Sequence, residues 1–131
     1  MDNIMFEKAQ AALKNCYVKY SNFHVGAALK MKDGTILTGV NIENASYGLS
    51  NCAERTALFS AYAQGYTKDD IEAVLVTTKQ SYFVSPCGAC RQVMNELVHA
   101  DVPVTMTDKD GNAQTLLNRE LLPLGFSGDD L

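Results

Sequence analysis

Two short stretches of this 131-residue chain combine cysteines with the residues that often accompany them at a metal centre. The first is the sequence CAER at residues 52–55, and the second is PCGAC at residues 86–90. Both precede segments rich in helix formers, so their cysteines are expected at helix N-termini. Free N–H groups and a partial positive charge at such ends favour thiolate over thiol. Three thiolates could therefore meet at one metal ion.

The ligand set Cys52, Cys87 and Cys90 is typical of a catalytic zinc site. Zinc prefers four ligands, so three protein ligands leave one position open for water. Glu54 lies two residues after Cys52, a spacing that lets its carboxylate reach that water and carry a proton without binding the metal. Zinc deaminases have a His or Cys ligand followed by x-Glu, and later in the chain Pro-Cys-x-x-Cys. This chain has the same pattern, with Cys52 as the first ligand in place of a histidine. We therefore expect one Zn²⁺ per subunit, with Glu54 as the proton shuttle.

The other residues that could react or bind metal are one arginine, one cysteine and two histidines, and none of them is expected to be a zinc ligand. Three thiolates carry more negative charge than Zn²⁺ balances, so Arg55 is hypothesised to offset the surplus by hydrogen-bonding a sulfur. Cys16 falls on the apolar face of the expected first helix, and we interpret it as a buried, small apolar side chain. His24 opens an expected strand, and His99 lies near an expected helix C-terminus, where its charge suits the helix dipole. Neither histidine is assigned to catalysis.

The overall composition excludes several classes of protein. Apolar residues make up 47% and charged residues 20% of the chain, values that fit a compact core and argue against disorder or a coiled coil. Eleven Lys and Arg face fifteen Asp and Glu, for a net charge of −4, so nucleic acid and anionic membranes are poor partners. No apolar run approaches the ~20 residues of a membrane-spanning helix. The opening residues lack a signal-peptide pattern, so we expect a cytoplasmic protein with reduced cysteines.

The residue patterns place these side chains on an α/β framework. An Asp-Gly turn joins two strands into a hairpin, which excludes a purely parallel sheet and favours a mixed sheet with helices packed against it. The length suggests a single domain over residues 1–131. Asp2 is expected to cap the first helix and Asn118 the last. We expect helices over about 3–20, 52–63, 87–100 and 119–122, and strands over about 25–31, 36–40, 71–77, 102–107 and 113–117.

Nearly the whole chain resembles the small, homotetrameric cytidine deaminases. The resemblance implies a three-layer α/β/α fold with a mixed five-stranded sheet. It also implies hydrolytic deamination of cytidine and 2′-deoxycytidine to uridine and 2′-deoxyuridine with release of ammonia, a step of pyrimidine salvage. The matching stretches are YSNFHVGAA at 20–28, GVNIENASY at 39–47, NCAERTA at 51–57, SPCGACRQ at 85–92, and ELLP at 120–123 with Phe126 beyond it.

The same resemblance implies a set of substrate contacts within one subunit. A nucleoside carries no phosphate, so an acidic protein can bind it, and ribose hydroxyls suit carboxylate and amide partners. The implied contacts are Asn41 and Glu43 at the ribose hydroxyls, Phe23 against the pyrimidine, and the backbones of Ala53 and Ser85 at the edge of the base.

Residues of a neighbouring subunit are implied as well. By similarity, Tyr47 and Phe126 would complete the pocket of an adjacent chain in a homotetramer. The stretch between Thr77 and Phe83 follows no recognised pattern. The family often has a threonine near the start of the terminal helix, where this chain has Leu-Asn-Arg at 117–119.

The motifs themselves leave two alternatives open. One is a deaminase for another substrate, such as an aminopyrimidine antibiotic or a nucleic-acid base, although the acidic charge argues against a polynucleotide. The other is a structural zinc module that binds a partner. Such a module needs a fourth protein ligand and has no use for Glu54.

Overall fold

The sheet has five strands in the order β2-β1-β3-β4-β5, seen in a computed structural model that describes residues 2–131. The first residue of the expected domain lies outside the described residues. Strand β3 pairs parallel with β4, while every other pairing is antiparallel, so the expected mixed sheet is confirmed. The strands are β1 (Val25–Met31), β2 (Ile36–Val40), β3 (Ile71–Thr78), β4 (Pro103–Thr107) and β5 (Ala113–Leu117).

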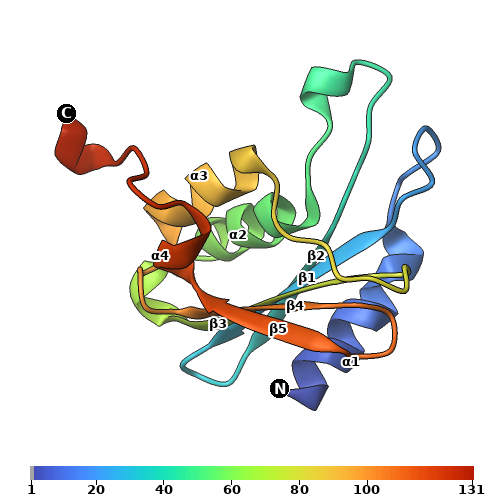
Figure 1. Cartoon of the computed structure of the whole chain (residues 1–131), viewed down its shortest axis with the longest axis horizontal. Coiled ribbons are helices and arrows are strands. Elements are labelled where there is room, and N and C mark those ends of the chain that lie inside the picture. Colours follow the sequence, from blue (N-terminus) through green and yellow to red (C-terminus); the bar gives the residue numbers. More distant parts are fainter. Residues whose placement is uncertain (1) are drawn as a thin grey trace.

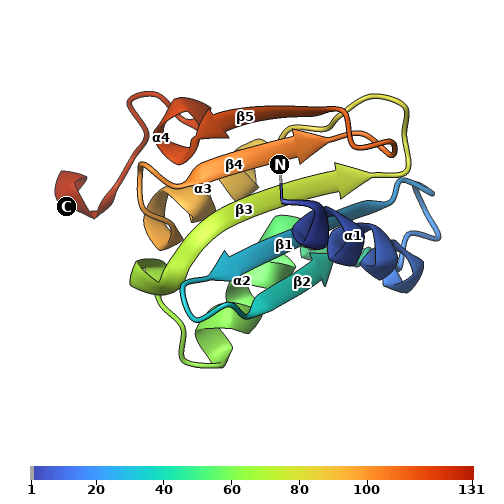
Figure 2. The same ribbon diagram turned by 90° about the horizontal axis from the view of Figure 1, so that it is seen from below.

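Helices cover both faces of this sheet. Figure 2 shows α1 (Asn3–Ala12) in front of the strands, with α2 (Ala53–Ala63) and α3 (Gly88–Leu97) behind them. The short helix α4 (Asn118–Leu121) follows β5 beside α3 (Figure 1). The three-layer α/β/α arrangement is therefore confirmed. None of the helices described over residues 2–131 combines the length and the apolarity that crossing a membrane requires.

Strand β1 is buried on both sides because a core lies on each face of the sheet. Ala27 and Leu29 belong to the larger core, which α2 and α3 cover. Ala28 points the other way and packs with Met5 and Ala9 of α1. A strand with two covered faces loses the alternation of apolar and polar residues that a half-exposed strand shows. The sequence of β1 is accordingly apolar at consecutive positions.

Gly39 of β2 lets helix α2 approach the sheet closely. A Cβ atom at this position would lie 2.4 Å from the backbone nitrogen of Ala57 and 2.5 Å from the carbonyl oxygen of Ala53. These distances are far shorter than van der Waals contact, so only glycine fits. The close approach fixes where α2 begins, and the residue before that first turn is Cys52.

The first helix is shorter than its periodicity predicts. It ends at Ala12 and continues as a 3₁₀ turn to Asn15, whereas the pattern predicts a helix to about residue 20. Beyond that turn the chain is extended, because Tyr17 pairs with the 41–43 segment: its N–H donates to the Asn41 carbonyl at 3.1 Å. The prediction of Asp2 as N-cap is confirmed, since its side chain accepts from two backbone amides.

Two assignments made from local sequence are wrong. Cys16 lies outside the helix and is half-buried rather than fully buried; its thiol lies 3.5 Å from the Val25 carbonyl, and burial raises its pKa. Asn118 is not the cap of α4 but its first residue. Its buried amide donates to the carbonyls of Met94 and Val98 at 2.9 and 3.0 Å, so the side chain serves the end of α3 instead.

Candidate metal centre and active site

Two helix N-termini bring three cysteine sulfurs together. Cys52 and Cys87 occupy the N-cap positions of α2 and α3, and Cys90 lies in the first turn of α3. Neither N-cap side chain accepts a capping hydrogen bond from the backbone amides of its own helix, so both sulfurs can face another group. The three Sγ atoms lie within 4.8 Å of one another. The structure thus gathers all three predicted metal ligands.

The sulfur cluster fits a zinc ion. Two ligands about 2.3 Å from a tetrahedral zinc ion lie about 3.8 Å apart, and the Sγ atoms of Cys52 and Cys87 are 3.6 Å apart. Among residues 2–131, no further Cys, His, Asp or Glu joins this group. Three protein ligands leave a fourth coordination position free, as catalytic zinc sites do. A closed structural site is therefore disfavoured.

Arg55 makes the contact expected of it. Its Nη2 donates to Cys52 Sγ at 3.3 Å, and its pKa is raised chiefly by this contact. The pKa of the Cys52 thiol falls to about 5, through the contact with Cys90 and the hydrogen bond from Arg55. The pKa of the Cys90 thiol is raised by its contact with Cys52 and by burial. The lowered pKa of Cys52 favours the thiolate, which is the form that binds a metal ion.

Glu54 is the buried carboxyl group of the site. It lies in the first turn of α2 with 4% of its surface exposed, and burial raises its pKa to about 7. A carboxyl group with a pKa near the working pH can both accept and return a proton. Glu54 also lines the apolar cavity beside the sulfurs, which is where a proton carrier for a bound substrate has to be.

That cavity has a volume of about 210 Å³. It is smaller than the ~300–1,000 Å³ typical of cavities for drug-sized ligands, and so it suits a single small ring. Its valines were missed by sequence reasoning, because an apolar residue looks the same in a sequence whether it lines a cavity or a core. The predicted site residues that line it are Phe23, Asn41, Cys52, Ala53, Glu54, Ser85 and Cys87, and the missed ones are Val25, Val76 and Val84.

Glu43 and Tyr47 line a second hollow rather than this cavity. Both oxygens of the Glu43 carboxylate are engaged by the turn before β1: Oε1 accepts from the backbone amides of Tyr20 and Ser21, each at 3.1 Å, and Oε2 accepts from the Ser21 hydroxyl. These contacts, led by that of Ser21, lower the pKa of Glu43. The carboxylate is therefore held in one orientation, and Ser21 is a second residue that the sequence reasoning missed.

Phe126 lies outside both hollows of this single chain. Its side chain is exposed, and its carbonyl accepts from Gln92 Nε2 and Asn95 Nδ2 of α3, each at 2.9 Å. Tyr47 is exposed as well. The structure thus brings neither residue to the cavity of its own chain, and their expected place in the pocket of a neighbouring subunit stays a prediction.

Comparison with known proteins gives a consistent answer. A family model described as "Cytidine and deoxycytidylate deaminase zinc-binding region" matches residues 1–106. A cytidine deaminase of Halalkalibacterium halodurans is 50% identical over 128 residues, which are 98% of this chain and 96% of that protein. One of Sporosarcina psychrophila is 44% identical over 127 residues, 97% of this chain and 92% of that protein.

Solved structures agree with the sequence relatives. The crystal structure of cytidine deaminase from Burkholderia pseudomallei has a TM-score of 0.92 and 47% identity, and the match covers 96% of this chain and 99% of that chain. The cytidine deaminase from Mycobacterium tuberculosis has a TM-score of 0.80 and 31% identity, with 96% and 98% covered.

Proposed function

The chain belongs to the cytidine and deoxycytidylate deaminase family, and we propose that Cys52, Cys87 and Cys90 hold its zinc while Glu54 moves its protons. Its reaction is the hydrolytic deamination of cytidine, in which water replaces the ring amino group and ammonia leaves. The observation that carries the assignment of residues is the cluster of three sulfurs beside the cavity that Glu54 lines. We propose 2′-deoxycytidine as a second substrate and pyrimidine salvage as the setting.

The metal chemistry follows from the donor set. When bound, zinc supplies the Lewis acidity that makes water nucleophilic at neutral pH. Three thiolates oppose this effect because they donate negative charge. The hydrogen bond from Arg55 to Cys52 Sγ withdraws part of that charge, as groups around a metal ligand commonly do. We propose one Zn²⁺ per subunit.

Glu54 carries each of the two protons that the reaction transfers. Its carboxylate takes the first proton from the attacking water and delivers it to N3 of cytosine, while C4 becomes tetrahedral. It then takes the remaining hydroxyl proton and delivers it to the amino group, which leaves as ammonia while C4=O forms. One carboxyl group suffices because it is deprotonated again after each delivery, and its pKa of about 7 suits both directions.

The substrate contacts follow the lining of the cavity. Phe23 would pack against the pyrimidine, and the backbones of Ala53 and Ser85 would read the edge of the base; all three line the same cavity as Glu54. Asn41 and Glu43 would bind ribose hydroxyls. Because a nucleoside carries no phosphate, the acidic charge of the chain is no obstacle to binding.

We also propose that the active enzyme is a homotetramer of single-domain subunits, each formed by residues 1–131. Large apolar side chains stand exposed on the single chain, among them Tyr47 at 76% and Phe126 at 57%, and such surfaces commonly mark protein interfaces. Each would reach the pocket of an adjacent subunit. The thiols of the metal cluster suit a reducing compartment, which supports the cytoplasm as location.

Two measurements on the purified protein test these proposals together. Metal analysis is expected to give about one zinc per chain. After cytidine is added, its ultraviolet absorbance is expected to fall with time as it is converted to uridine. Zinc without turnover of cytidine, but with turnover of an aminopyrimidine antibiotic, would reassign the substrate. Zinc without any turnover would favour a structural module. A fully active monomer in sizing chromatography would overturn the tetramer.

A further inference from the structure

We propose that Ser21 is a positioning residue for sugar recognition: its hydroxyl holds the Glu43 carboxylate in the orientation that binds the ribose. The inference rests on the proposed function, in which Glu43 contacts a ribose hydroxyl. Ser21 is exposed and belongs to the turn between α1 and β1. It lines the same hollow as Glu43.

The turn leaves the Glu43 carboxylate with little capacity to spare. An ionised carboxylate offers about four acceptor positions, two on each oxygen. The backbone amides of Tyr20 and Ser21 take both positions of Oε1, and the Ser21 hydroxyl takes one position of Oε2. One acceptor position of Oε2 remains for a ligand hydroxyl. The Ser21 hydroxyl helps to set its direction, because that hydroxyl is the hydrogen-bond partner of Oε2, while the two amides hold Oε1.

The direction of the Ser21 hydroxyl is determined from both sides. The backbone N–H of Phe23 donates to Ser21 Oγ at 3.0 Å, so this oxygen is an acceptor on that side. An ionised carboxylate only accepts, so the hydroxyl hydrogen points to Glu43. The three groups form a chain in which each hydrogen bond polarises the next. This chain links Phe23, the residue proposed to pack against the base, to Glu43, the residue proposed to read the sugar.

Asn41 holds the other side of the same segment. Its Nδ2 donates to the Phe23 carbonyl at 2.7 Å, and its Oδ1 accepts from Val25 N–H at 3.0 Å. The turn is also tight, since Asn22 has a φ of +54° and donates its N–H to the Val18 carbonyl at 2.7 Å. The Phe23 N–H is therefore linked to Glu43 through the Ser21 hydroxyl, and the Phe23 carbonyl accepts directly from Asn41. Base and sugar contacts form one preorganised unit.

The test compares two substrates that differ in the hydroxyls of the sugar, cytidine and 2′,3′-dideoxycytidine. We expect Ser21→Ala to raise KM for cytidine about tenfold while kcat changes less than about twofold, because a hydrogen bond to a charged group is lost. KM for the dideoxy substrate is expected to change less than about twofold. Ser21→Thr retains the hydroxyl and should restore KM for cytidine, while Ser21→Cys, a weak donor, should fall between them.

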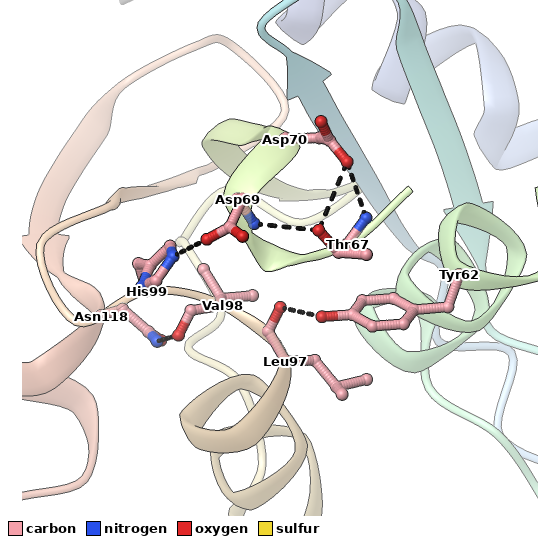
Figure 3. A network of polar contacts seen from close by, with 8 residues as sticks. All are labelled: Tyr62, Thr67, Asp69, Asp70, Leu97, Val98, His99 and Asn118. Carbon is pink, nitrogen blue, oxygen red and sulfur yellow. Dashed lines mark hydrogen bonds and ion pairs between the residues drawn. The ribbon is translucent and has the colours of Figure 1, made fainter. Parts of the chain in front are cut away.

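Thr67 offers a matched control in a distant turn. Its hydroxyl accepts from the Asp69 amide at 3.3 Å and lies 3.4 Å from the Asp70 carboxylate (Figure 3), so it repeats the arrangement of Ser21 outside both hollows. Thr67→Ala is expected to change neither KM. Each variant is first checked for wild-type thermal unfolding, and the comparison uses KM ratios, which lost stability alone does not shift.

The outcomes separate the inference from its premise. If Glu43→Gln lowers the preference for cytidine but Ser21→Ala does not, the role of Ser21 is wrong and that of Glu43 stands. If Glu43→Gln leaves the preference unchanged, sugar reading by Glu43 is wrong and the inference falls with it. Equal loss on both substrates in Ser21→Ala would show a structural role and would also overturn the inference.

Discussion

The two ends of helices α2 and α3 use polar side chains in opposite ways. At their N-terminal ends lie Cys52 and Cys87, which make no cap hydrogen bond, and the buried Glu54 with its raised pKa. Near their C-terminal ends, each polar side chain drawn in Figure 3 has at least one partner within the protein. The Tyr62 hydroxyl of α2 donates to the Leu97 carbonyl of α3 at 2.8 Å, and the Asn118 amide donates to the Val98 carbonyl.

The contrast shows which polar residues stabilise and which react. Buried polar groups normally find hydrogen-bond partners, and exceptions concentrate at functional sites. Among residues 2–131, the one fully buried side-chain N or O atom without a partner is Nε of Arg55, beside the sulfurs. We therefore expect substitutions at the N-terminal end to change turnover more than stability. Substitutions at the C-terminal end should do the reverse.

The largest effect is expected at the N-terminal end from Glu54→Gln. This change removes the proton carrier but not a sulfur, so kcat for cytidine should fall about 10²–10⁴-fold, as for other general acid–base residues. Zinc content and unfolding free energy at neutral pH should stay close to wild type, because an amide replaces a carboxyl group that burial already disfavours as an anion. Normal turnover by this variant would refute the role of Glu54.

The next largest effect is expected at the C-terminal end from Asn118→Ala. The Asn118 side chain is 5% exposed and serves two carbonyls at the end of α3. Losing the amide leaves the buried Val98 carbonyl without its partner, whereas the Met94 carbonyl still accepts the Val98 N–H at 3.0 Å. The unfolding free energy should therefore fall by about 1–3 kcal/mol. Denaturant unfolding measures this, with kcat per folded molecule expected within about twofold. A large loss of kcat in the folded variant would break the division between the two ends.

A third, smaller effect is expected from Arg55→Gln at the N-terminal end. Without the hydrogen bond to Cys52 Sγ, zinc affinity should fall about 10- to 100-fold, the range for partners of metal ligands. Competition with a chelator of known affinity measures the loss. Arg119→Gln is the matched control, because this exposed arginine of α4 lies away from the sulfurs. Unchanged zinc retention and turnover in Arg55→Gln would count against the proposed role.

The features that the sequence predicted correctly depend on residues that are close together in the chain. The three sulfurs and Glu54 follow from short spacings within two helix starts, and the hairpin of β1 and β2 follows from its Asp-Gly turn. Such features are local, so a pattern of neighbouring residues contains them.

The wrong predictions depend on partners distant in the chain. The first helix ends early because Tyr17 pairs with the segment after β2. The Asn118 side chain does not cap its own helix because it binds carbonyls 20 and 24 residues earlier. Ser21 was missed for the same reason, since its partner Glu43 is 22 residues away. No local periodicity records such contacts.

The smallest effect is expected from Asp69→Asn in the C-terminal network. Asp69 Oδ1 lies 2.5 Å from His99 Nε2, but the side chains are 78% and 44% exposed, so solvent screens the pair. The contact with His99 holds the pKa of Asp69 below its usual value of 3.8. Its contribution to stability is therefore present above about pH 4 and is lost as the pH falls through the lower pKa of the folded protein.

Unfolding curves at several pH values test this last expectation. The variant should be slightly less stable than wild type at pH 5–6, by less than Asn118→Ala. The difference should shrink as the pH falls below 3.8, because the wild-type carboxylate becomes protonated as the pH passes through its lowered pKa. Glu96→Gln, on an exposed face of α3, is the control and should show no such pH dependence. A difference that does not shrink as the pH falls would mean that Asp69 acts through packing rather than charge. A loss of kcat in Asp69→Asn would contradict the comparison between the two ends, because polar groups that have partners at the C-terminal ends should not affect turnover.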